Sequence, residues 1–118
     1  MILVATAAEH SIREDGSCRL ERREHPLAAP LPADSLWIDL IRPTREEDLA
    51  VEKHLGISIP TREDMADIEP SEVLYSEDGA RYMTARLLFA ANTDTPGLAN
   101  VTFILKDRTL VTVRYDEP

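Results

Sequence analysis

Residues 36–56 read LWIDLIRPTREEDLAVEKHLG, and this stretch predicts a strand followed directly by a helix. Leu36–Ile41 is mostly apolar, which is typical of a central strand in a sheet. Thr44 followed by Glu47 matches the capping box that begins many helices, and the acidic residues around it suit the positive end of the helix dipole. Gly56 is a helix-ending residue, so the helix is expected to stop there.

A second, short helix is expected from Thr61 to just before Pro70, because proline cannot donate a backbone hydrogen bond and disfavours a helical residue before it. At 100° per residue its acidic and apolar side chains fall on neighbouring arcs, so the carboxylates face solvent. The acidic arc holds Glu63, Asp64 and Asp67. The first helix has a looser apolar face, made of Leu49, Val51 and Leu55.

Strands are expected both before and after the two helices in the sequence. Asp15-Gly16 and Asp78-Gly79 each predict a hairpin, since Asp-Gly tolerates the positive φ angles of tight turns. The apolar start of the chain and the β-branched segments 101–105 and 109–115 read as further strands. The order of strands, helices and strands predicts one α/β (α+β) domain over residues 1–118. Its core is a mixed, roughly seven-stranded sheet with helices packed on its faces.

Composition excludes several classes of function. The 118 residues carry a net charge of -9, which argues against nucleic acid and against anionic membrane surfaces as partners. No apolar run reaches the length of a transmembrane helix, so the chain is expected to be soluble, and its single cysteine fits a reducing, cytoplasmic compartment. Cys18 is the only cysteine, so an intrachain disulfide and a zinc ribbon are impossible.

Catalytic signatures are lacking, and an enzyme is not expected. The sequence has no phosphate-binding glycine loop, no nucleophile elbow and no His-Glu-x-x-His motif. Its three histidines are too far apart in sequence to form a local metal-binding pair. The tract 63–78 holds seven carboxylates and no Lys or Arg, and magnesium takes such oxygen ligands. A solvated helix face explains the same spacing, so residue patterns alone leave both readings open.

The order of motifs resembles the CorA family of magnesium transporters and its zinc-transporting ZntB relatives. The resemblance covers residues 36–118, and the segment before it matches less clearly. The motifs that carry it are Trp37-Ile38-Asp39-Leu40, Pro43-Thr44, residues 51–57, Pro60-Thr61-Arg62-Glu63-Asp64-Met65, Ile68-Glu69-Pro70-Ser71, Leu74-Tyr75, Asp78-Gly79, Tyr82-Met83-Thr84, residues 101–105 and residues 110–115.

The resemblance implies the amino-terminal cytosolic domain of such a transporter, without the stalk and membrane helices that would carry ions. It implies a homopentamer for the full protein, on the cytoplasmic face of the inner membrane, and a monomeric or weakly associated fragment. Glu63 and Asp64 match positions that hold regulatory magnesium against a neighbouring subunit. With Asp67 they are the candidate metal ligands, and half of such a site binds magnesium weakly.

The transported ion stays open among magnesium, cobalt, nickel and zinc, because selectivity belongs to the pore. The origin of the chain, as an engineered fragment or a truncated gene, stays open as well. An alternative function is a free-standing interaction module that binds a protein partner through a sheet edge or an acidic face. A reading frame that continues beyond Pro118 into a long helix and two hydrophobic segments would favour the transporter.

Overall fold

A computed structural model describes residues 1–6, 11–12, 18–19, 22–66, 74–89 and 97–115. Its main sheet has seven strands in the order β4-β1-β5-β9-β8-β7-β6. These strands are β4 (Arg23–His25), β1 (Ile2–Thr6), β5 (Ser35–Ile41), β9 (Thr109–Arg114), β8 (Gly97–Lys106), β7 (Ala80–Phe89) and β6 (Leu74–Glu77). Only β5 and β9 pair in parallel, so the predicted mixed sheet of seven strands is confirmed.

The two predicted hairpins end up in different sheets. The Asp78-Gly79 turn joins β6 to β7 with φ angles of 51° and 75°, as a tight hairpin requires. The strands flanking Asp15-Gly16 are β2 (Ser11–Ile12) and β3 (Cys18–Arg19), which pair only with each other. The strands β1 and β4, which lie before β2 and after β3 in the chain, belong to the main sheet instead. The main sheet therefore has the expected seven strands, but β2 and β3 are not among them.

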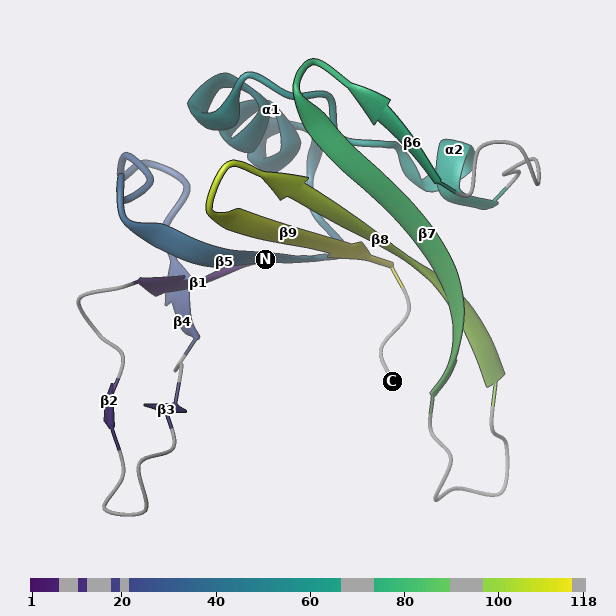
Figure 1. Cartoon of the computed structure of the whole chain (residues 1–118), viewed down its shortest axis with the longest axis horizontal. Coiled ribbons are helices and arrows are strands. Elements are labelled where there is room, and N and C mark those ends of the chain that lie inside the picture. Colours follow the sequence, from purple (N-terminus) through teal and green to yellow (C-terminus); the bar gives the residue numbers. More distant parts are fainter. Residues whose placement is uncertain (7–10, 13–17, 20–21, 67–73, 90–96, 116–118) are drawn as a thin grey trace.

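Both described helices cover the same face of the sheet, as Figure 1 shows. They are α1 (Arg45–Leu55) and α2 (Arg62–Ala66). The capping box of Thr44 and Glu47 is present, and Gly56 ends α1 in the left-handed region at φ 69°. A second reciprocal cap begins α2, where Thr61 and Asp64 exchange backbone and side-chain hydrogen bonds of 3.0 and 3.1 Å.

The hydrophobic core lies between these helices and the sheet. Val51 of α1 and Met65 of α2 pack against alternate residues of the central strands, namely Ile38, Leu40, Tyr82, Ile104, Val111 and Val113. The hydroxyl of Tyr82 donates to the carbonyl of Ser58 at 2.7 Å and fixes the connection between the helices. This connection places α2 over β8.

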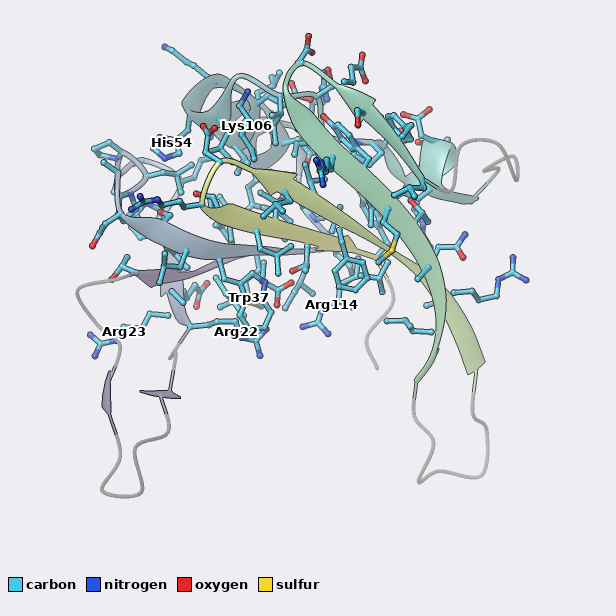
Figure 2. All side chains as sticks on the ribbon, in the orientation of Figure 1. Arg22, Arg23, Trp37, His54, Lys106 and Arg114 are labelled. Atoms are coloured by element: carbon cyan, nitrogen blue, oxygen red, sulfur yellow. The ribbon has the colours of Figure 1, made fainter. Side chains whose placement is uncertain are left out.

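The opposite face of the sheet is helix-free in the described part of the chain. Figure 2 shows Trp37 and Arg114 on this side, away from α1. Strand alternation puts Met83, Leu87 and Leu105 there as well, and they are 43%, 44% and 48% exposed. We call this surface the open face. It is apolar at its β7–β8 end and polar around Asp39.

Candidate metal-binding site

Helix α2 presents the two described candidate ligands, and it is anchored from beneath. Met65 is buried in the core, and the side-chain amide of Asn100 on β8 donates to the Met65 carbonyl at 2.6 Å. The preceding segment is held by Ile59, which is also buried. Because the apolar side of this one-turn helix faces inward, Glu63 and Asp64 are exposed.

Asp64 is oriented by its role as a helix cap. Its Oδ2 accepts from the backbone N–H of Thr61 at 3.0 Å, and its own N–H donates to Thr61 Oγ1 at 3.1 Å. This capping leaves Oδ1 without a hydrogen-bond donor among the described residues. Asp64 therefore offers one free carboxylate oxygen in a defined position, as a hydrated cation requires.

Glu63 forms no ion pair with any residue that the structure describes. It lies close enough to Tyr115 for their charges to interact. Burial raises the pKa of Tyr115 to about 12, and the carboxylates of Asp48 and Glu63 add to the effect. Arg62 stacks over the same ring with 5.9 Å between its guanidinium carbon and the ring centre. Glu63 and Asp64 thus form an exposed acidic pair on α2.

The third predicted ligand, Asp67, lies outside the described residues. Within those residues, no group of three or more His, Cys, Asp or Glu side chains is placed to hold a metal ion. His25 and His54 are both described; Nε2 of His25 lies 3.1 Å from the Ala29 carbonyl, and His54 is exposed near the end of α1. What the described chain offers is a pair of carboxylates, which can supply part of a coordination shell and leave the rest to water.

A buried carboxyl on α1 was not expected. Leu49 was predicted to pack on the sheet but is 48% exposed, whereas Asp48 beside it is 3% exposed. Burial raises the pKa of Asp48 to about 6, with a further contribution from the Glu52 carboxylate, and Oδ1 of Asp48 has no hydrogen-bond partner among the residues that the structure describes. Asp48 lies three residues before Val51, and this spacing puts both side chains on the buried face of α1. The sequence did not predict this burial, because a carboxylate is rarely fully buried.

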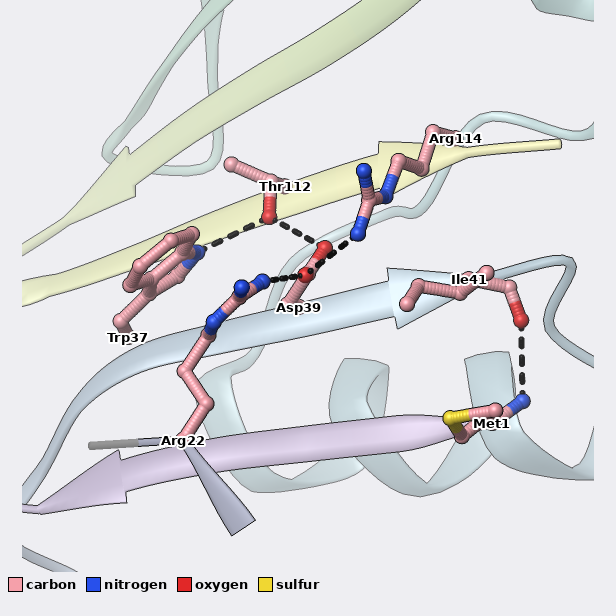
Figure 3. A network of polar contacts seen from close by, with 7 residues as sticks. All are labelled: Met1, Arg22, Trp37, Asp39, Ile41, Thr112 and Arg114. Carbon is pink, nitrogen blue, oxygen red and sulfur yellow. Dashed lines mark hydrogen bonds and ion pairs between the residues drawn. The ribbon is translucent and has the colours of Figure 1, made fainter. Parts of the chain in front are cut away.

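Asp39 forms the centre of a second unexpected network, shown in Figure 3. It is 1% exposed and binds the guanidinium groups of Arg22 and Arg114, the latter at 3.2 Å. Thr112 Oγ1 donates to Asp39 Oδ1 at 2.8 Å and accepts from the indole N–H of Trp37 at 2.9 Å.

Trp37 was interpreted as core, yet it is only half-buried and carries Arg22 over its ring at 4.4 Å. Every partner in this network is supplied by the chain itself. We therefore assign the Asp39 network a structural role, in which two arginines compensate one buried carboxylate.

No helix in the described ranges is both long and apolar enough to cross a membrane. No protein-family model matches the chain. The chain is similar to the magnesium transport protein CorA of Escherichia coli K12, with 34% identity over 99 residues that make up 84% of this chain and 31% of that protein. The protein of the same name from Pectobacterium atrosepticum is 34% identical over 101 residues, 86% of this chain and 32% of its own length.

Among solved structures, the CorA magnesium transporter of Methanocaldococcus jannaschii matches with a TM-score of 0.54 and 17% identity. The match covers 99% of this chain and 33% of that one. It shows that the two share a fold. The chain spans about a third of the length of each of these relatives.

Proposed function

The chain is a domain of the CorA family, and from that premise we propose that it is the amino-terminal cytosolic domain of a divalent-cation transporter, with a regulatory role. The relatives are named for magnesium transport, and magnesium is accordingly the cation that we propose. Transport itself would belong to the remaining two-thirds of such a protein. The part played by this domain is to sense the cytosolic cation.

The acidic pair on α2 is the observation that carries this proposal. Glu63 and Asp64 are exposed and have no ion-pair partner among the described residues, in a helix that Asn100 holds firmly on the sheet. Unpaired neighbouring carboxylates repel each other, and a hard cation relieves that repulsion. We add Asp67, which follows Glu63 by four residues in the sequence, as a third ligand.

A site of this kind would be completed by a second protomer. Magnesium keeps several water ligands and needs only one or two carboxylates from each side. If the other carboxylates come from a neighbouring subunit of a homopentamer, cation binding stabilises one arrangement of subunits over another. That differential affinity is what couples occupancy to channel closure.

The proposal predicts weak magnesium binding by the isolated chain, because half of the site is missing. Magnesium titrated into the isotope-labelled chain should shift the amide signals of Glu63, Asp64 and Asp67 only at millimolar concentration, which corresponds to about 4 kcal/mol of binding free energy. Glu63→Gln combined with Asp64→Asn should remove these shifts. Asn preserves the cap, since its side-chain oxygen also accepts from Thr61.

The matched control removes two exposed carboxylates elsewhere, as Glu46→Gln with Asp107→Asn. Asn tolerates the φ of 52° at position 107. This variant has the same net charge as the test variant and should keep the shifts on α2. Micromolar binding, or equal loss of binding in both variants, would contradict the half-site.

A free-standing interaction module is the second candidate, and the open face favours it. Met83, Leu87 and Leu105 expose an apolar surface that is covered in most folded domains. The same surface suits a domain that packs against further polypeptide of its own chain. The downstream reading frame separates the two: a stalk helix and two hydrophobic segments support the transporter, and a stop codon after Pro118 supports the module.

A further inference from the structure

A pocket of about 360 Å³ lies between α2 and the strands β7 and β8, on the helix-covered side of the sheet. Its size is at the lower end of small-molecule sites. Arg62 of α2, Arg86 of β7, Asn100 of β8 and Tyr115 after β9 supply its polar lining. One helix, two strands and the residue that follows β9 therefore place their side chains around one cavity.

The charge of this pocket is opposite to that of the protein. The chain carries 22 acidic and 13 basic residues, yet the lining residues that the structure describes include two arginines and no carboxylate. Of the described carboxylates, those of Asp48 and Glu63 act on the lining, since their charges reach Tyr115. Neither Arg62 nor Arg86 forms an ion pair with a residue in the described ranges. Two uncompensated guanidinium groups around one cavity create a positive potential where an anion can bind.

The lining is held in place before any ligand binds. Asn100 donates to the Met65 carbonyl at 2.6 Å, and its Oδ1 lies 3.5 Å from Nε of Arg86, so one amide links α2 to β7 through β8. Arg62 is stacked over the ring of Tyr115. The guanidinium carbon of Arg62 lies 5.9 Å from the ring centre, and the Arg62 N–H groups have no acceptor in the described part of the chain.

Tyr115 contributes a neutral donor. Its pKa is raised to about 12, chiefly by burial, so the phenol keeps its proton at every physiological pH. A protonated hydroxyl can donate to an anion and cannot repel it. The pocket thus combines two fixed positive charges with a neutral hydroxyl donor.

We propose that this pocket binds a phosphate dianion, as inorganic phosphate or as the phosphoryl group of a small phosphomonoester. Arginine forks match phosphate oxygens with paired hydrogen bonds, and one dianion neutralises both guanidinium charges. A carboxylate monoanion would neutralise only one of them. The site lies beside the acidic pair Glu63 and Asp64, since Arg62 directly precedes Glu63 and the Glu63 carboxylate acts on Tyr115. Its ligand is an anion, and it does not require magnesium.

The test is a titration of the isotope-labelled chain with sodium phosphate and with glycerol 3-phosphate, at ionic strength held constant with sodium chloride. Amide signals of Ala66, Ala99 and Asn100 should shift with a dissociation constant on the order of millimolar or below. Phosphate has a second pKa of about 6, so the affinity should rise between pH 5.5 and 7.5 as the dianion forms. Equal shifts with sodium acetate would overturn the assignment to phosphate.

Arg62→Gln and Arg86→Gln should each weaken binding about tenfold or more, since each removes a charge-assisted hydrogen bond. Arg81→Gln is the matched control, because Arg81 lies on the same strand as Arg86 and strand alternation puts it on the open face. Glu63→Gln with Asp64→Asn should leave phosphate binding in place, so the cation and anion proposals can fail independently. Equal weakening by Arg81→Gln, or no shift at about 20 mM phosphate, would overturn the site.

Discussion

At the scale of single residues, two buried aspartates have opposite environments. Asp39 is compensated by two guanidinium groups, of Arg22 and Arg114, and by a hydrogen bond from Thr112. Asp48 has an oxygen without a hydrogen-bond partner in the described part of the chain, and its pKa is raised to about 6. Asp48 therefore lowers the stability of the native domain wherever it is ionised.

The folded pKa of Asp48 lies above its unfolded value, so the native state binds the extra proton between about pH 4 and pH 6. The stability that the protonated Asp48 carboxyl contributes is fully present below the unfolded pKa, and it is lost as the pH rises through the folded pKa. The stability of Asp48→Asn relative to the parent chain should therefore increase by about 2 kcal/mol from pH 4.5 to pH 7.5. Denaturant unfolding at both pH values measures this difference.

Glu46→Gln is the control for this experiment, since Glu46 is exposed on the same helix. It should change the free energy of unfolding by only a few tenths of a kcal/mol, roughly equally at both pH values. If Asp48→Asn were destabilising to the same extent at pH 4.5 and 7.5, the carboxyl would not titrate as described.

At the scale of elements, the start of α1 is joined to the first strand. Glu47 Oε1 accepts from the backbone N–H of Thr44 at 3.0 Å and from the amino group of Met1 at 2.8 Å. The Met1 amino group also donates to the Ile41 carbonyl, as Figure 3 shows. Burial works to raise the pKa of Glu47, but the amino terminus and Thr44 outweigh it and lower that pKa. The cap thus stabilises the start of α1 and the start of β1 together.

Thr44→Ala should lower the free energy of unfolding by about 1 kcal/mol, because it removes the acceptor for the Glu47 N–H. Thr44→Ser keeps that oxygen and should stay close to the parent chain. Urea unfolding of the three proteins measures the difference. Equal loss of stability in the Ala and Ser variants would point to packing of the threonine methyl group and against the cap.

At the scale of the whole molecule, the open face determines how the domain behaves alone. Its exposed apolar residues lie on β7 and β8, and the polar Asp39 network lies beside them on β5 and β9. We expect the isolated chain to be monomeric or weakly associated, because the proposed pentamer depends on segments beyond this domain. Light scattering over a range of concentrations measures this. A stable pentamer of the isolated chain would contradict the expectation.

Much of the fold follows from the sequence because its signals are local. The capping box joins residues three apart, Gly56 ends a helix through its own φ angle, and Asp78-Gly79 sets a turn within two residues. These interactions form wherever the segment is placed. The exposure of Glu63 and Asp64 follows likewise from which side of α2 carries Met65. Their role as metal ligands stays a prediction.

Only the tertiary structure decided the burial of charge. Asp39 binds Arg22, which is 17 residues away in the sequence, and Arg114, which is 75 residues away. Arg62 of α2 and Arg86 of β7 likewise line one cavity. Asp48 rather than Leu49 faces inward because the rotation of α1 is set by how Val51 packs in the core. Local rules depend on neighbours within one turn, whereas burial depends on which distant surfaces meet, and the periodicity of a single segment does not contain that information.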